Sequence, residues 1–67
     1  MLTLSLNGET VQCEPASNIT LLLDQEGYET QKIAVAINGD FVPRSRYGEV
    51  TLNNGDEVDV IQAVGGG

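Results

Sequence analysis

The sequence predicts a small α+β roll, in which one main helix lies across one face of a mixed sheet of four to five strands. Three observations support this prediction. Two segments have a strand-like pattern and contain an Asn-Gly dipeptide, one segment between them has apolar residues at helical spacing, and a last alternating segment lies near the C-terminus. With 67 residues, the chain has room for one domain with a modest core.

The N-terminal segment is predicted to form a hairpin over residues 2–13. In "LTLSL" three leucines alternate with polar residues, which is the period of a half-buried strand. Asn7-Gly8 favours a type I′ turn, and "ETVQC" alternates again, so Cys13 falls in phase with the core. Pro15 then ends the second strand, because proline cannot donate to a strand ladder.

The next segment, "SNITLLLDQEG", is predicted to form a short helix. It has apolar residues at positions i, i+3 and i+4: Ile19, Leu22 and Leu23. Ser17 or Asn18 can cap the N-terminus, and Gly27 can adopt the left-handed conformation that ends a helix. We expect Leu21 to widen the apolar face of this helix.

The second half of the chain is predicted to contain a hairpin and a final strand. Residues 33–37, "IAVAI", are too short and too β-branched for a helix, and an Asn-Gly turn and "DFVP" follow them. We expect "RSRYG" to be an irregular turn and "EVTL" to be a short strand or turn. After the turn signal "NNGDE", Val58 and Val60 should face inward, and Asp59 and Ile61 outward.

The charge of the chain bounds its partners. Ten carboxylates outnumber three cations, Lys32, Arg44 and Arg46, and the formal net charge is -7. A nucleic acid would require a basic surface, so this composition argues against one. Such a charge would steer the chain toward a basic cleft on a partner, although it also simply favours solubility.

The composition also argues against a metal site and against secretion. One cysteine cannot form an internal disulfide, and without histidine or a second cysteine there is no zinc or iron-sulfur ligand set. The N-terminus lacks the pattern of a signal peptide, and no segment has the length of a membrane span. We therefore expect a cytoplasmic protein that does not act at a membrane.

The sequence ends in "IQAVGGG", which divides into a domain over residues 1–62 and a flexible glycine-rich tail over residues 63–67. These glycines cannot form a nucleotide-binding loop, because no helix follows them. Three interpretations remain: a linker, a frayed end, or a tail whose terminal carboxylate is the functional group. Residues without side chains suit the third, since they can thread a narrow channel and leave the carbonyl open to attack.

Several segments together resemble the ThiS family, which has the β-grasp, ubiquitin-like fold. They are "LNGETVQC", "IAVAINGDFVPRSRYGEV" and "LNNGDEVDVIQAVGGG", and the similarity spans nearly all 67 residues. The order and spacing of "AIN", "VPR", "GDEVDVI" and the final Gly-Gly make the resemblance fairly specific, although each motif alone is weak.

This resemblance implies a sulfur carrier for thiazole formation in thiamin biosynthesis. The Gly67 carboxylate would be adenylated by a ThiF-type enzyme that uses ATP, and converted to a thiocarboxylate with sulfur from a cysteine-derived donor. A ThiG-type thiazole synthase would then receive the sulfur. Gly65 and Gly66 would enter partner active sites as an extended arm, and the chain itself would bind no cofactor.

Other residues can be interpreted in more than one way. Ile61 and Asp59 are candidate partner contacts beside the tail, but single exposed apolar residues and solvated acids are ordinary. Arg44, in the "VPR" motif, could bind an anion or form a surface ion pair. Cys13 could carry a persulfide, but its strand position favours an inert core thiol.

No catalytic constellation is recognisable, so we expect a protein co-substrate and not an enzyme. Two alternatives stay open. One is a carrier like the small subunit of molybdopterin synthase, which has the same ending, and the other is a ubiquitin-like adaptor whose tail is never activated.

Overall fold

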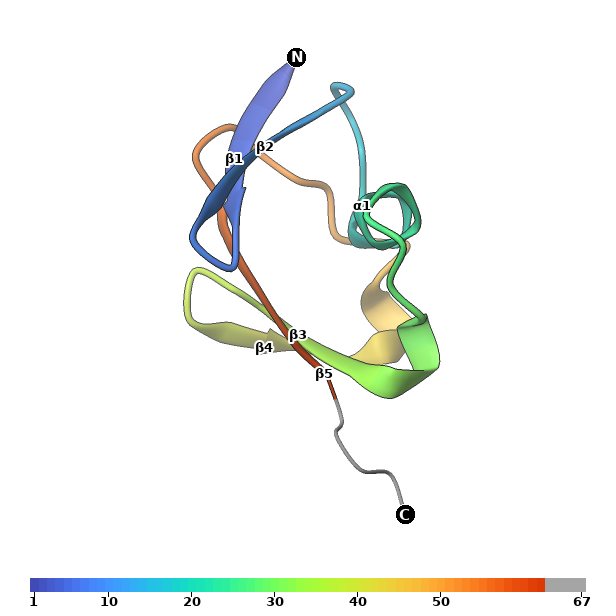
Figure 1. Cartoon of the computed structure of the whole chain (residues 1–67). Coiled ribbons are helices and arrows are strands. Elements are labelled where there is room, and N and C mark those ends of the chain that lie inside the picture. The colour runs from blue at the N-terminus through green and yellow to red at the C-terminus, as the bar shows by residue number, and fades with distance from the viewer. Residues whose placement is uncertain (63–67) are drawn as a thin grey trace.

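The computed structural model describes residues 1–62, which form five strands and one α-helix (Figure 1). The strands are β1 (Leu2–Leu6), β2 (Glu9–Cys13), β3 (Ile33–Ile37), β4 (Asp40–Val42) and β5 (Glu57–Gln62). The helix is α1 (Ile19–Gln25), and two 3₁₀ helices, η1 (Thr30–Lys32) and η2 (Arg44–Arg46), flank the second hairpin. Residues 63–67 lie outside the described part of the chain.

The five strands form one mixed sheet in the order β2-β1-β5-β3-β4. The first and last strands, β1 and β5, lie parallel at its centre, and the other neighbours are antiparallel. The prediction of an α+β roll with a mixed sheet is therefore confirmed. Placing β5 between the two hairpins joins the two halves of the chain into one sheet.

Both predicted hairpins are present. Asn7 and Gly8 have φ angles of 52° and 84°, and Asn38 and Gly39 have φ angles of 52° and 87°. Positive φ at both central residues is what a type I′ turn requires. The two-residue loops fix the register, and the strand pairings Leu6↔Glu9 and Ile37↔Asp40 close the hairpins.

The helix α1 begins and ends as its sequence predicts. Of the two candidate caps, Asn18 provides the bond: its side-chain oxygen accepts from the backbone N–H of Leu21 at 2.9 Å. Gly27 has a φ of 79°, in the left-handed region. The expectation for Leu21 is wrong, because its side chain is 55% exposed. Since α1 has seven residues, only a narrow stripe of it reaches the core.

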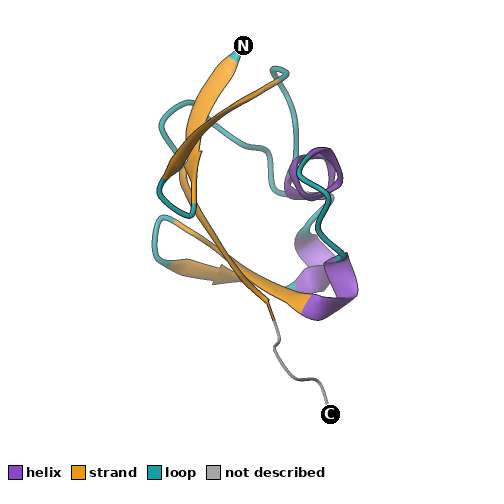
Figure 2. Ribbon diagram, viewed as in Figure 1, coloured by secondary structure: helices purple, strands orange, loops and turns teal. Residues whose placement is uncertain are grey.

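The core lies between α1 and the sheet, and the two 3₁₀ helices lie on the same side (Figure 2). The segment "EVTL" forms no strand, and an isolated bridge pairs Asn18 with Thr51. The buried apolar residues are Leu4, Leu6, Cys13, Ile19, Leu22, Leu23, Ile33, Val35, Val42, Tyr47, Leu52, Val58 and Val60. In the described part of the chain, the opposite face of the sheet carries no helix.

Candidate functional site

The central strand β5 leads directly to the glycine-rich end of the chain. Gln62, its last residue, pairs with Ile33 at the start of β3. Gly65, Gly66 and Gly67, which the sequence predicts to form the reactive tail, lie outside the described residues. The structure therefore defines the strand to which that segment is attached, and the predicted boundary at residue 62 stays a prediction.

The side chains of β5 alternate as predicted. Val58 and Val60 are buried against the helix side, whereas Asp59 and Ile61 point to the opposite face. Ile61 is 66% exposed, although it lies one residue before the end of the strand. The structure thus places both predicted contact residues on an open surface, and leaves their role as partner contacts a prediction.

Phe41 is a candidate contact residue that the sequence interpretation missed. Its side chain is 69% exposed, and it lies opposite Ala36 in the β3–β4 hairpin. Ala36 in turn lies opposite Asp59 of β5, and Ala34 lies opposite Ile61. The sequence did contain a signal, because a two-residue turn after Ile37 sets Phe41 against Ala36, on the face that Val35 does not occupy.

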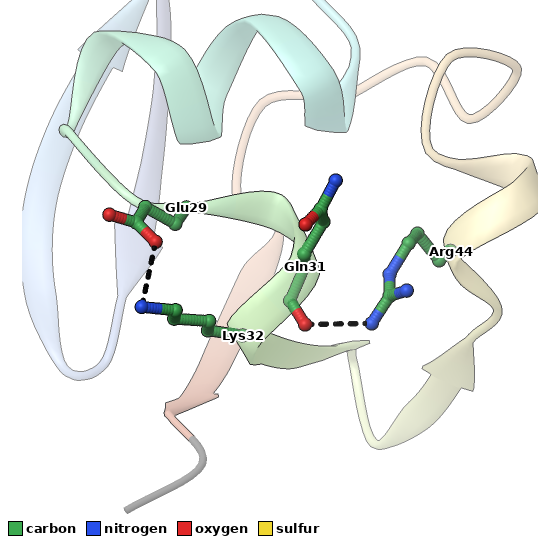
Figure 3. A network of polar contacts seen from close by, with 4 residues as sticks. All are labelled: Glu29, Gln31, Lys32 and Arg44. Atoms are coloured by element: carbon green, nitrogen blue, oxygen red, sulfur yellow. Dashed lines mark hydrogen bonds and ion pairs between the residues drawn. The ribbon is translucent and has the colours of Figure 1, made fainter. Parts of the chain in front are cut away.

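The three cations of the chain come from the two 3₁₀ helices. The Arg44 guanidinium donates to the backbone carbonyl of Gln31 at 3.1 Å, which ties η2 to η1 (Figure 3). Lys32 pairs with Glu29 at 3.3 Å, between nitrogen and carboxylate oxygen. Because this pair is solvent-exposed, it contributes little stability.

The other arginine, Arg46, pairs with Glu49 at 3.7 Å, as expected for a surface ion-pair former. Its neighbour Arg44 instead makes the bond to the Gln31 carbonyl. These two side chains therefore do different things, and the described contacts do not join them in one anion clamp. Partner binding by Arg44 stays a prediction.

Of the acidic residues around β5, Asp56 has a structural role. It is 9% exposed, and its carboxylate accepts from the backbone N–H of Asn53 at 2.8 Å and from Asn38 Nδ2 at 3.1 Å. These bonds hold the turn before β5. Glu57 and Asp59 are exposed on the outer face and are thus the acids available to a partner there.

Cys13 lies in the core, as its strand position predicts. It is 1% exposed, and burial raises the pKa of its thiol, with a further increase from the nearby charge of Glu26 and an opposing effect of Gln25. A raised pKa keeps the thiol neutral and weakly nucleophilic. The structure therefore favours the core interpretation over a persulfide carrier.

Within residues 1–62, no three histidine, cysteine or acidic side chains come together as a metal-binding group. None of the helices in that part is long and apolar enough to cross a bilayer.

A sheet with one helix on one face, and a central last strand that continues into a glycine-rich end, defines the chain as a β-grasp protein. The sequence model of the ThiS family matches residues 4–67, and the chain belongs to that family.

Similar proteins agree with this assignment. The sulfur carrier protein ThiS of Escherichia coli is 30% identical over 61 residues, which are 91% of this chain and 92% of that protein. The crystal structure of the thiamine biosynthesis protein ThiS from Geobacter metallireducens superposes with a TM-score of 0.84 at 26% identity, covering 98% of this chain and 100% of that one.

A longer protein is also similar. A thiazole synthase from Paramagnetospirillum magneticum is 34% identical over 64 residues, which are 96% of this chain but 20% of that protein. The chain therefore spans about one fifth of the length of this relative.

Proposed function

We propose that this chain is a sulfur carrier of thiamin biosynthesis, and that the carboxylate of Gly67 is the group that carries the sulfur. The observation that carries the proposal is the match to the ThiS family, which extends through residue 67. The similarity to a sulfur carrier protein over 91% of the chain supports the same role.

The chemistry of a carboxylate explains why such a carrier needs a partner enzyme. Its negative charge repels nucleophiles, and oxide is a poor leaving group. In the proposed reaction a ThiF-type enzyme supplies the ATP site, and the Gly67 carboxylate attacks the α-phosphorus and releases pyrophosphate. Sulfur from a cysteine-derived donor then displaces AMP from the acyl-adenylate and leaves a thiocarboxylate.

The sulfur in a thiocarboxylate is a better nucleophile than the oxygen it replaces, because its charge lies on a larger and more weakly solvated atom. A ThiG-type thiazole synthase would use this nucleophile. In support, a region similar to nearly all of this chain lies within a protein named thiazole synthase. In this scheme the chain is a co-substrate that binds no cofactor of its own and acts in the cytoplasm.

The proposed role of the folded body is to let partners recognise the tail that they process. Ile61 and Asp59 lie next to the end of β5, and Arg44 lies in η2. We therefore keep all three as proposed partner contacts. Gly65 and Gly66 would form the arm that brings the terminal carboxylate into each active site.

The test is the intact mass of the chain after incubation with ATP, a ThiF-type enzyme and a cysteine-derived sulfur source. We expect a mass gain equal to the replacement of one oxygen by sulfur, located at Gly67 by fragmentation. An unchanged mass with partners that are active on another carrier would support the adaptor alternative. Transfer to a molybdopterin synthase large subunit, and none to a thiazole synthase, would assign the chain to the other pathway.

A further inference from the structure

The outer face of the sheet, opposite α1, has a polar half and an apolar half. On β1 and β2 this face carries Thr3, Ser5, Thr10 and Gln12. On β3, β4 and β5 it carries four apolar residues, which we call the apolar half-face: Ala34, Ala36, Phe41 and Ile61. The division falls at β5, the strand that leads to the tail (Figure 1).

The apolar half-face has the profile of a docking surface. Phe41 and Ile61 are more than half exposed, and the small side chains of Ala34 and Ala36 lie between them on β3. Two large side chains beside a low alanine strip leave space for apolar groups of a partner. Aromatic residues are enriched in interface cores, and a Phe on an exposed edge strand is otherwise a hazard for aggregation.

The charges beside the apolar half-face indicate the chemistry of its partner. Glu57 and Asp59 are exposed on the same face of β5, and Asp59 lies directly opposite Ala36. The whole chain carries a net charge of -7. A complementary surface therefore has apolar pockets with basic side chains at their rim.

We propose that the apolar half-face docks on a thiazole synthase, with Phe41 and Ile61 in apolar pockets and Asp59 paired with a basic side chain. This inference rests on the proposed function and adds the surface that this partner recognises. The choice of partner follows from the similar region within a protein named thiazole synthase.

The position of this surface also suits delivery of the tail. Ile61 lies next to Gln62, and five residues follow Gln62 in the sequence. Five residues in a fully extended chain span at most about 17 Å. An enzyme bound to the apolar half-face thus holds the Gly67 carboxylate within about 17 Å of the end of β5, a depth that an active-site channel can match.

The experiment measures binding of the full chain to the thiazole synthase from the same genome. Phe41→Thr and Ile61→Thr remove the exposed apolar side chains but keep residues that favour strands. Leu21→Gln is the matched control, because Leu21 is also more than half exposed but lies on α1. Thermal unfolding of each variant verifies that it folds.

We expect each threonine variant to raise the Kd roughly tenfold or more, and the Leu21→Gln control to leave it unchanged. Removal of Gly66 and Gly67 should abolish sulfur loading but leave most of this binding, which separates the docking surface from the proposed function. Wild-type binding by both threonine variants would overturn the proposal. Loss of sulfur loading with intact synthase binding would also overturn it, and would assign the surface to the activating enzyme.

Discussion

At the scale of single residues, Cys13 couples stability to pH. Its pKa is raised in the folded protein, first by burial and then by Glu26, whereas an unfolded thiol ionises near about 8.5. The stabilisation from this difference is fully present below the unfolded pKa and is lost as pH rises through the folded pKa. The unfolded chain then holds fewer protons than the folded one, so stability falls.

We therefore expect the free energy of unfolding to decrease as pH rises above about 8.5. Urea denaturation from about pH 7 to about pH 10 measures this slope. Cys13→Ala should be less stable at every pH because it leaves a cavity, but its slope should be shallower. Equal slopes in the two proteins would contradict this prediction.

Ala16 has a backbone conformation that disfavours its own side chain. Its φ is 68°, in the left-handed region that costs an alanine about 1–2 kcal/mol. The loop holds it there, because the Ser17 N–H donates to the Glu14 carbonyl at 3.2 Å and the Leu52 N–H donates to the Ser17 carbonyl at 2.8 Å. The strain is thus part of how the β2–α1 connection meets the segment after η2.

Ala16→Gly should raise the free energy of unfolding by about 0.5–1 kcal/mol, because relief of strain exceeds the added entropy of the unfolded chain. Ala34→Gly is the control. Ala34 lies inside β3, where glycine should weaken the strand. Equal losses in both variants in chemical denaturation would mean that Ala16 is unstrained.

At the scale of elements, both hairpin turns also bind the central strand. The Asn7 side-chain oxygen accepts from the Val60 N–H at 2.8 Å, and that of Asn38 accepts from the Glu57 N–H at 2.9 Å. The bond from Asn7 comes beyond the short parallel pairing of β1 with β5, which ends at Leu6↔Val58. Each turn asparagine thus continues the hydrogen bonding of β5 where no neighbouring strand does so.

Asn7→Gly separates these two roles of the turn residue. Glycine tolerates the positive φ but removes the acceptor for the Val60 N–H, so we expect a loss of about 1–2 kcal/mol in the free energy of unfolding. Asn7→Asp keeps an oxygen acceptor and should lose less. Denaturant melts of both variants measure this difference, and a glycine variant as stable as the wild type would show that the bond adds nothing.

The elements differ in how well their sequences predict them. Alternation and Asn-Gly turns are local signals, so both hairpins, α1 and β5 were predicted. The 3₁₀ helices were not, because three-residue turns leave no periodic pattern. The bond of Arg44 to the Gln31 carbonyl also has no local signature, since it depends on how two separate loops meet.

At the scale of the whole molecule, the apolar half-face arises from long-range pairing. Ala34 meets Ile61 because β3 pairs with β5, and no local pattern specifies that neighbour. The exposure of Ile61 was predicted from alternation within β5, whereas its proximity to the β3–β4 hairpin required the topology. Sequence reasoning therefore found the members of the surface on β5 but not those on β3 and β4.

The molecule should separate folding from function along the chain. Every residue of the described core precedes Ile61, and Gly66 has no side chain to add to it. Gly66→Leu should therefore change the free energy of unfolding by no more than about 0.5 kcal/mol. In the proposed reaction, however, a bulky residue beside Gly67 displaces the carboxylate from attack on ATP, and sulfur loading should fall about 100-fold.

Thermal unfolding and the initial rate of thiocarboxylate formation, measured by intact mass, test the two halves of this prediction separately. Gly66→Ala serves as the graded control, because one methyl group should reduce loading less than a leucine side chain does. A large drop in the melting temperature of Gly66→Leu would mean that the C-terminal segment contributes to the fold. Normal loading of that variant would mean that access to Gly67 does not require small residues, since a channel that admits leucine places no steric demand on the tail.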